Sequence, residues 1–79
     1  MVPADELLAA TRALADKIVA GPPLALRLDK QALNRAASTD LASALEIEAF
    51  SQGLAVASDD HQEGVAAFFE KRPPKFTGR

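Results

Sequence analysis

The sequence predicts an all-α fold of four short helices. Apolar residues recur every three or four positions, and no stretch alternates between apolar and polar residues as a half-buried strand would. Alanine, the strongest helix former, supplies 17 of the 79 residues. Stop signals at Gly21-Pro22, Ser38-Thr39 and Pro73-Pro74 divide the chain. We therefore expect helices near residues 3–20, 22–37, 40–57 and 59–71, followed by an extended tail.

The first two helices have one apolar stripe each. Pro3 suits a first helical turn, and Asp5 and Glu6 follow it at the positive end of the helix dipole. The stripe of the first helix is Leu7, Ala10, Leu14 and Ile18, and that of the second is Leu24, Leu28, Ala32 and Ala36. The Ser38-Thr39-Asp40 cluster ends the second helix and caps the third, and we expect Thr39 to be the N-cap residue.

The third expected helix, residues 40–57, is apolar on most of its sides. Its apolar residues are Leu41, Ala44, Leu45, Ile47, Ala49, Phe50, Leu54, Ala55 and Val56. A helix of this kind is normally buried on most sides, and three short neighbours cannot cover it. The pattern therefore predicts a partner surface and self-association. Gly53, inside the helix, indicates a kink or the close approach of another backbone.

The fourth expected helix is amphipathic, and a basic tail (residues 73–79) follows it. Ser58 is placed to cap the helix, although Asp60 and Glu63 have the spacing of a capping box that could replace it. The apolar face is Val65, Phe68 and Phe69. We expect Lys71 and Arg72 to lie in the last turn, where cations suit the negative helix end.

The composition excludes several classes of protein. The chain has no cysteine and a single histidine, His61, which argues against disulfides and against most zinc sites. The net charge of −2 gives no general attraction to nucleic acid or to an anionic membrane. No apolar run reaches the length of a membrane span, and the first residues lack a secretion signal pattern. We expect a cytoplasmic protein with no metal site, no nucleic-acid partner and no membrane association.

The last third of the chain resembles a known family. The pattern S-x-D-x-x-E-G-x-x-A-F-x-E-K-R-x-P-x-F-x-G over residues 58–78 is similar to the C-terminal signature of the crotonase family, the enoyl-CoA hydratases and isomerases. Similar segments occur earlier, at residues 2–8, 21–25 and 30–34. The resemblance implies that residues 1–72 are the C-terminal helical domain of a crotonase, and that the family's spiral strand–helix core would precede Met1.

The resemblance also implies a function. Crotonases act on acyl-CoA thioesters with an oxyanion hole and, in hydratases, two glutamates, all belonging to the core. Glu46, Glu48, Glu63 and Glu70 do not match those motifs, so we assign no catalytic residue and expect no activity from this chain alone. CoA is then part of the substrate, and no separate cofactor is implied. In similar crotonases these helices form trimers, often doubled to hexamers.

Phe68 and Lys71 are the candidate binding residues. Their spacing predicts that both side chains leave one side of the helix. In similar crotonases an aromatic residue and a lysine at these positions approach the CoA adenine and phosphates from a neighbouring subunit. The alternative is that Phe68 is a core residue and that Lys71 interacts with the helix dipole, and Phe69 could exchange roles with Phe68.

The residues allow two other functions to be considered. The chain could be an autonomous helical interaction module with no role toward CoA. A helix-turn-helix DNA binder is disfavoured because the basic residues are not gathered on one helix. His61, between acidic residues and without a serine or cysteine partner, is expected to be an exposed surface residue.

Overall fold

The computed structural model describes residues 1–79, and every regular element in it is helical. A short 3₁₀ turn, η1 (Ala4–Glu6), leads into α1 (Leu7–Val19). It is followed by α2 (Pro23–Ala36), α3 (Leu41–Val56) and α4 (Asp59–Glu70). The prediction of an all-α fold with four helices is confirmed. The first helix differs in its start, because its first turn is 3₁₀ rather than α.

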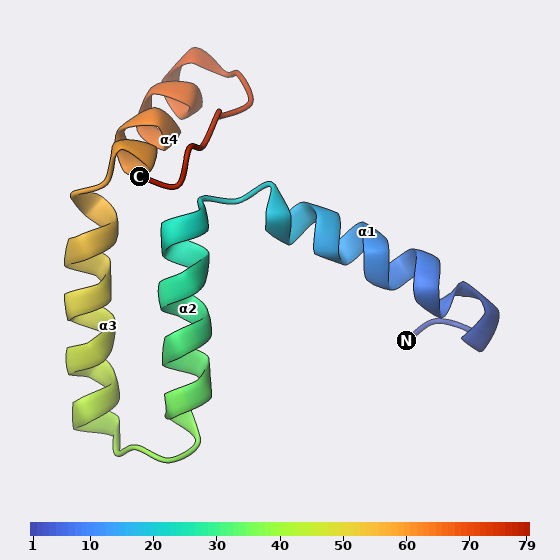
Figure 1. The fold of residues 1–79 in the computed structure, drawn as a ribbon, viewed down its shortest axis with the longest axis horizontal. Helices are drawn as coiled ribbons and strands as arrows, with labels where there is room; N and C mark the ends of the chain where they lie inside the picture. Colours follow the sequence, from blue (N-terminus) through green and yellow to red (C-terminus); the bar gives the residue numbers. More distant parts are fainter.

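The helices form an open arrangement (Figure 1). α2 and α3 run side by side as an antiparallel hairpin, α4 turns across the end of α3, and α1 projects away from the other three helices. The radius of gyration is 15.6 Å, whereas a compact chain of this length has about 12 Å. No helix is both long enough and apolar enough to cross a membrane.

The cap of α3 differs from the expected one. Asp40, not Thr39, is the N-cap: its carboxylate accepts hydrogen bonds from the Ser43 N–H at 2.8 Å and the Ser43 hydroxyl at 3.0 Å. Asp40 has extended backbone directly before the first helical residue, which is the position from which a side chain reaches the free N–H groups. The Ser43 N–H bond, followed by the Ser43 hydroxyl bond, lowers the pKa of Asp40.

The chain has almost no core of its own. Only Ala67 and Asp60 are buried, each with 2% of its surface exposed. No residue of α3 is buried, and Phe50 is 72% exposed, so the burial expected for this helix does not come from its own chain. Around Gly53 no atom lies within 4 Å of the position a Cβ would occupy, so no backbone of this chain approaches it.

Candidate functional site

Ser58 is the N-cap residue of α4, as the sequence predicted. The Ser58 hydroxyl oxygen accepts a hydrogen bond from the His61 N–H at 3.1 Å and donates one to the Ala55 carbonyl at 2.6 Å. His61 itself is exposed, as expected. Ser58 therefore joins the end of α3 to the start of α4 and fixes where α4 begins.

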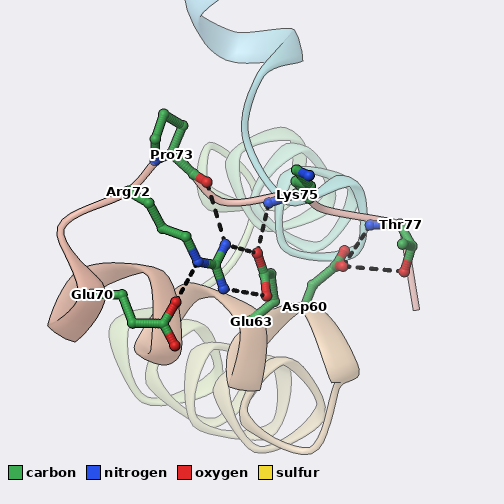
Figure 2. Close-up of polar contacts among 7 residues, drawn as sticks. All are labelled: Asp60, Glu63, Glu70, Arg72, Pro73, Lys75 and Thr77. Atoms are coloured by element: carbon green, nitrogen blue, oxygen red, sulfur yellow. Dashed lines mark hydrogen bonds and ion pairs between the residues drawn. The ribbon is translucent and has the colours of Figure 1, made fainter.

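Asp60 is the one buried polar residue, and it holds the tail (Figure 2). Its carboxylate accepts a hydrogen bond from the main-chain N–H group of Thr77 at 2.7 Å, which Figure 2 shows. It accepts another from the main-chain N–H group of Gly78 at 2.8 Å. The Thr77 hydroxyl adds a longer contact at 3.4 Å. The main-chain N–H of Asp60 donates to the Arg79 main-chain oxygen at 2.8 Å. One residue of α4 thus binds three consecutive residues of the tail.

Glu63 holds the tail one turn further along α4. Its two carboxylate oxygens accept hydrogen bonds from Nη1 and Nη2 of Arg72 at 2.5 and 3.1 Å, and Oε1 also accepts from the Lys75 N–H at 2.9 Å. The capping box proposed for Asp60 and Glu63 is therefore wrong, because both carboxylates are turned toward the tail instead of toward the helix start. We call Asp60, Glu63 and Arg72 the tail clasp.

The tail runs back along α4 and supports part of its surface (Figure 1). The ring of Phe76 lies over Gly64, 3.6 Å from the position that a Cβ would occupy there, so the ring packs against this turn of α4. Gly78 has a φ of 83°, a left-handed conformation that suits glycine, and lies against Pro23 at the start of α2. The tail thereby connects α4 with α2.

The end of α4 lies one residue earlier than predicted, and Lys71 is not helical. Its φ of 54° and ψ of 42° are left-handed, which costs a residue other than glycine about 1–2 kcal/mol. The N–H of Lys71 donates to the Phe68 carbonyl and that of Arg72 to the Ala67 carbonyl, the pattern of a Schellman motif. Lys71 and Arg72 therefore follow the helix, and the expectation of cations in its last turn is wrong.

Phe68 and Phe69 both face solvent. They are 79% and 76% exposed, and their rings meet edge to face with centroids 5.7 Å apart. Neither ring belongs to a core of this chain. Because Lys71 has left the helix, a helical spacing of three no longer determines where its side chain points relative to Phe68. The two residues remain neighbours at the end of α4, joined by the hydrogen bond from the Lys71 N–H to the Phe68 carbonyl.

A groove opens beside the two phenylalanines. Its volume is about 360 Å³, and it lies between the start of α2, the end of α3, α4 and the tail. The groove is lined by Pro22, Ala25, Ala55, Ser58, Asp60, His61, Gly64, Val65, Phe68, Phe69 and Phe76. The walls are mainly carbon, so the groove suits an apolar or aromatic group. No group of three or more His, Cys, Asp and Glu residues is arranged to hold a metal ion.

The sequence reasoning missed the tail clasp. Part of the signal was present: Arg72 directly follows α4, and α4 carries four acids. A cation that directly follows an acidic helix lies within reach of the acids of its last turns, so the ion pairs of Arg72 could have been expected. The backbone contacts of Asp60 could not have been found in this way, since they depend on the path of the tail.

Glu63 gives the tail clasp a defined pH dependence. Its hydrogen bonds from Arg72, followed by the Lys75 N–H bond, lower its pKa from 4.5 to about 2. Because the pKa is lower in the folded state, this contact stabilises the fold fully above about pH 4.5 and is lost as the pH falls toward 2. We expect the Glu63 carboxyl carbon, followed by NMR, to titrate with a midpoint near 2, together with the Lys75 amide.

Glu63→Gln is the control for this titration. The variant keeps the shape of the side chain and removes its charge, so the Lys75 amide should no longer report a titration of residue 63. A Glu63 midpoint near the ordinary 4.5 in the original chain would contradict the ion pair.

The sequence profile described as enoyl-CoA hydratase/isomerase matches residues 1–79, the whole chain. The chain belongs to the enoyl-CoA hydratase/isomerase family. The expected family is thus confirmed, and with it the crotonase-type identity of the four helices. An enoyl-CoA hydratase of Bacillus anthracis has the same arrangement in its solved structure, with a TM-score of 0.91 and 33% identity over 99% of this chain and 30% of that protein.

Two relatives in this family carry names for different reactions. The human enoyl-CoA hydratase domain-containing protein 2, mitochondrial, is 44% identical over 68 residues, which are 86% of this chain and 23% of that protein. The 1,2-epoxyphenylacetyl-CoA isomerase of Escherichia coli is 45% identical over 76 residues, 95% of this chain and 29% of that protein. The chain spans less than a third of each relative, and similar identities accompany names for different reactions.

Proposed function

We propose that this chain acts as the helical association domain of an enoyl-CoA hydratase/isomerase-type enzyme, with a smaller part in binding CoA. The exposed surface is the observation that carries the proposal. A compact monomer of 8.3 kDa exposes about 4,600 Å², whereas this chain exposes 6629 Å². The excess of about 2,000 Å² is more than the ~800 Å² that one partner contributes to a standard protein–protein interface.

The chemistry of this surface fits protein partners. Sixteen large apolar side chains are exposed, and all but Met1 and Val2 are distributed over the four helices. Each one that becomes buried contributes roughly 1.5–3 kcal/mol, so covering several of them would stabilise a chain that has no core of its own. We propose homo-oligomers as the assembly, trimers or hexamers in the family that the chain resembles. A cytoplasmic location remains part of this proposal.

The CoA part of the proposal rests on the end of α4. Phe68 presents an exposed aromatic face, and Lys71 adds an ammonium group three residues further on. An aromatic face stacks well on adenine, and a lysine ammonium binds phosphate as a point charge. The family resemblance supports the same two residues, contributed to the CoA site of a neighbouring subunit.

Light scattering coupled to gel filtration tests the association. At about 10–100 μM, we expect a mass well above 8.3 kDa that falls on dilution. A folded monomer near 8.3 kDa throughout this range would overturn the association. CoA is then titrated into the chain while the Phe68 and Lys71 resonances are followed by NMR. Association without any effect of CoA would favour an autonomous interaction module.

We expect no hydratase activity from this 79-residue chain. The main-chain N–H groups of Thr77 and Gly78 are taken up by the Asp60 carboxylate, and that of Lys75 by Glu63. Neither these donors nor these carboxylates are left to form an oxyanion hole or to act on an acyl-CoA. The measurement is hydration of a 2-enoyl-CoA, followed as loss of the enoyl absorbance. Turnover above the buffer rate, in a preparation free of other hydratases, would contradict the expectation.

A further inference from the structure

The conformation of Lys71 needs support from outside the helix. Glycine is the usual residue at the left-handed position after a helix, because it has no Cβ to clash there. Lys71 is the only residue other than glycine with a positive φ in this chain. The two hydrogen bonds of the Schellman motif go with a left-handed residue at this position, but they do not remove the steric cost that the Cβ of a lysine meets there.

The contacts of Arg72 supply that support (Figure 2). Its Nε donates to Glu70 at 2.6 Å, so the two residues on either side of Lys71 are tied directly to each other. The same guanidinium holds Glu63, nine positions earlier, with two further hydrogen bonds. The backbone of Lys71 is thus enclosed between two tethered neighbours, one of which is anchored to the body of α4.

The rest of the tail is also attached to α4, through Glu63 and Asp60. The N–H of Lys75 binds the same Glu63 oxygen as Arg72, and Thr77 and Gly78 are held by Asp60. The chain after Lys71 is therefore attached at successive points along α4 and cannot turn freely. Only the first of these attachments, that of Arg72, acts directly on the residues flanking Lys71.

We propose that Arg72, held by Glu63 and Glu70, is a positioning residue that fixes the backbone of Lys71 and thereby the placement of its ammonium group at the Phe68 site. This rests on the proposed role of Phe68 and Lys71 in CoA binding. A guanidinium is suited to the task because its planar fork binds a carboxylate with two nitrogens and still leaves Nε for Glu70. A lysine at position 72 carries the charge but cannot make these bonds together.

The test compares three variants of the full chain. Arg72→Met removes the contacts, and Arg72→Lys keeps only the charge. Lys75→Met removes a tail charge whose side chain makes no hydrogen bond in the clasp, since Lys75 binds Glu63 through its main chain. NMR couplings and chemical shifts give the φ of residue 71, and a titration with CoA gives the affinity. Exchange of the Thr77 and Gly78 amides reports whether the tail end stays attached to Asp60.

We expect both Arg72 variants to shift most of the Lys71 population out of the left-handed region. CoA binding should weaken about tenfold, because only the molecules with a left-handed Lys71 still bind CoA. Lys75→Met should change neither quantity. In a Lys71→Gly background, Arg72→Met should leave φ at residue 71 positive, since glycine needs no support. A positive φ in this double variant would show that Arg72→Met does not unfold the end of α4, so its effect on Lys71 is one of positioning.

An unchanged φ of Lys71 in Arg72→Met would overturn the proposal, and so would an equal effect of Lys75→Met. Normal CoA affinity in Arg72→Lys would overturn it as well, because charge alone would then suffice. If the original chain does not bind CoA, the proposed function fails in that part. The φ measurements still decide whether Arg72 positions Lys71, so the two failures are distinguishable.

Discussion

Replacing Asp60 by asparagine should release the tail from α4 and lower the free energy of unfolding by about 2–3 kcal/mol. The carboxylate is 2% exposed and accepts two short hydrogen bonds from main-chain N–H groups of Thr77 and Gly78. Hydrogen bonds to a charged group contribute about 1.5–3 kcal/mol each, and an amide side chain can accept with only one of its two terminal atoms. Urea unfolding followed by circular dichroism measures the loss.

Asp59→Asn is the matched control. Asp59 is the preceding residue, is exposed and has the same favourable place at the positive end of α4, but it makes no hydrogen bond to the tail. Its replacement should cost only the dipole interaction, about 0.3–1 kcal/mol. Amide exchange at Thr77 and Gly78 should accelerate in Asp60→Asn alone. Equal losses in the two variants would mean that the tail contributes little to stability.

The second large effect concerns self-association. Phe50→Glu should weaken it by about tenfold to a hundredfold, since burial of a phenylalanine side chain contributes roughly 1.5–3 kcal/mol. Phe50 lies beside a shallow groove between α2 and α3 and is 72% exposed in the single chain. The dependence of the scattering mass on concentration gives the association constant. Circular dichroism checks that the helices are retained.

Gln52→Glu places the same charge two residues further along α3. Gln52 is exposed and already polar, so this variant changes the net charge without removing apolar surface. We expect it to associate nearly as the original chain does. If Phe50→Glu associates with the same constant as the original chain, the interface does not include this part of α3. The self-association surface would then have to lie on another apolar face.

The helices could be predicted because their signals are local. Prolines, glycines and the three- to four-residue apolar spacing act within a few residues, so the boundaries near Pro23, Ala36 and Val56 were anticipated to within one or two positions. Thr39 was mistaken for the cap of α3 because it and Asp40 are both good capping residues. The residue at which the helical backbone begins decides which of two such neighbours is the cap. Sequence patterns locate that start only to within one or two residues.

The candidate site was predictable only in part. The family pattern drew attention to Phe68 and Lys71, but regular helical spacing does not apply to this pair, because Lys71 has a left-handed backbone. The clasp depends on contacts between residues up to 18 positions apart, such as Asp60 with Gly78. Patterns of hydrophobicity and charge carry little information on pairs of this kind, since they do not specify the direction in which a proline-rich tail returns.

The isolated position of α1 has a mechanical consequence. Its 13 residues make a rod about 20 Å long, attached through Gly21 and two prolines. Pro22 and Pro23 fix their own φ angles, and each also restricts the residue before it. The Gly21 N–H is bonded to the Ile18 carbonyl as well. These restraints hold α1 at a defined angle to α2, so a partner that bound α1 would have less backbone freedom to remove.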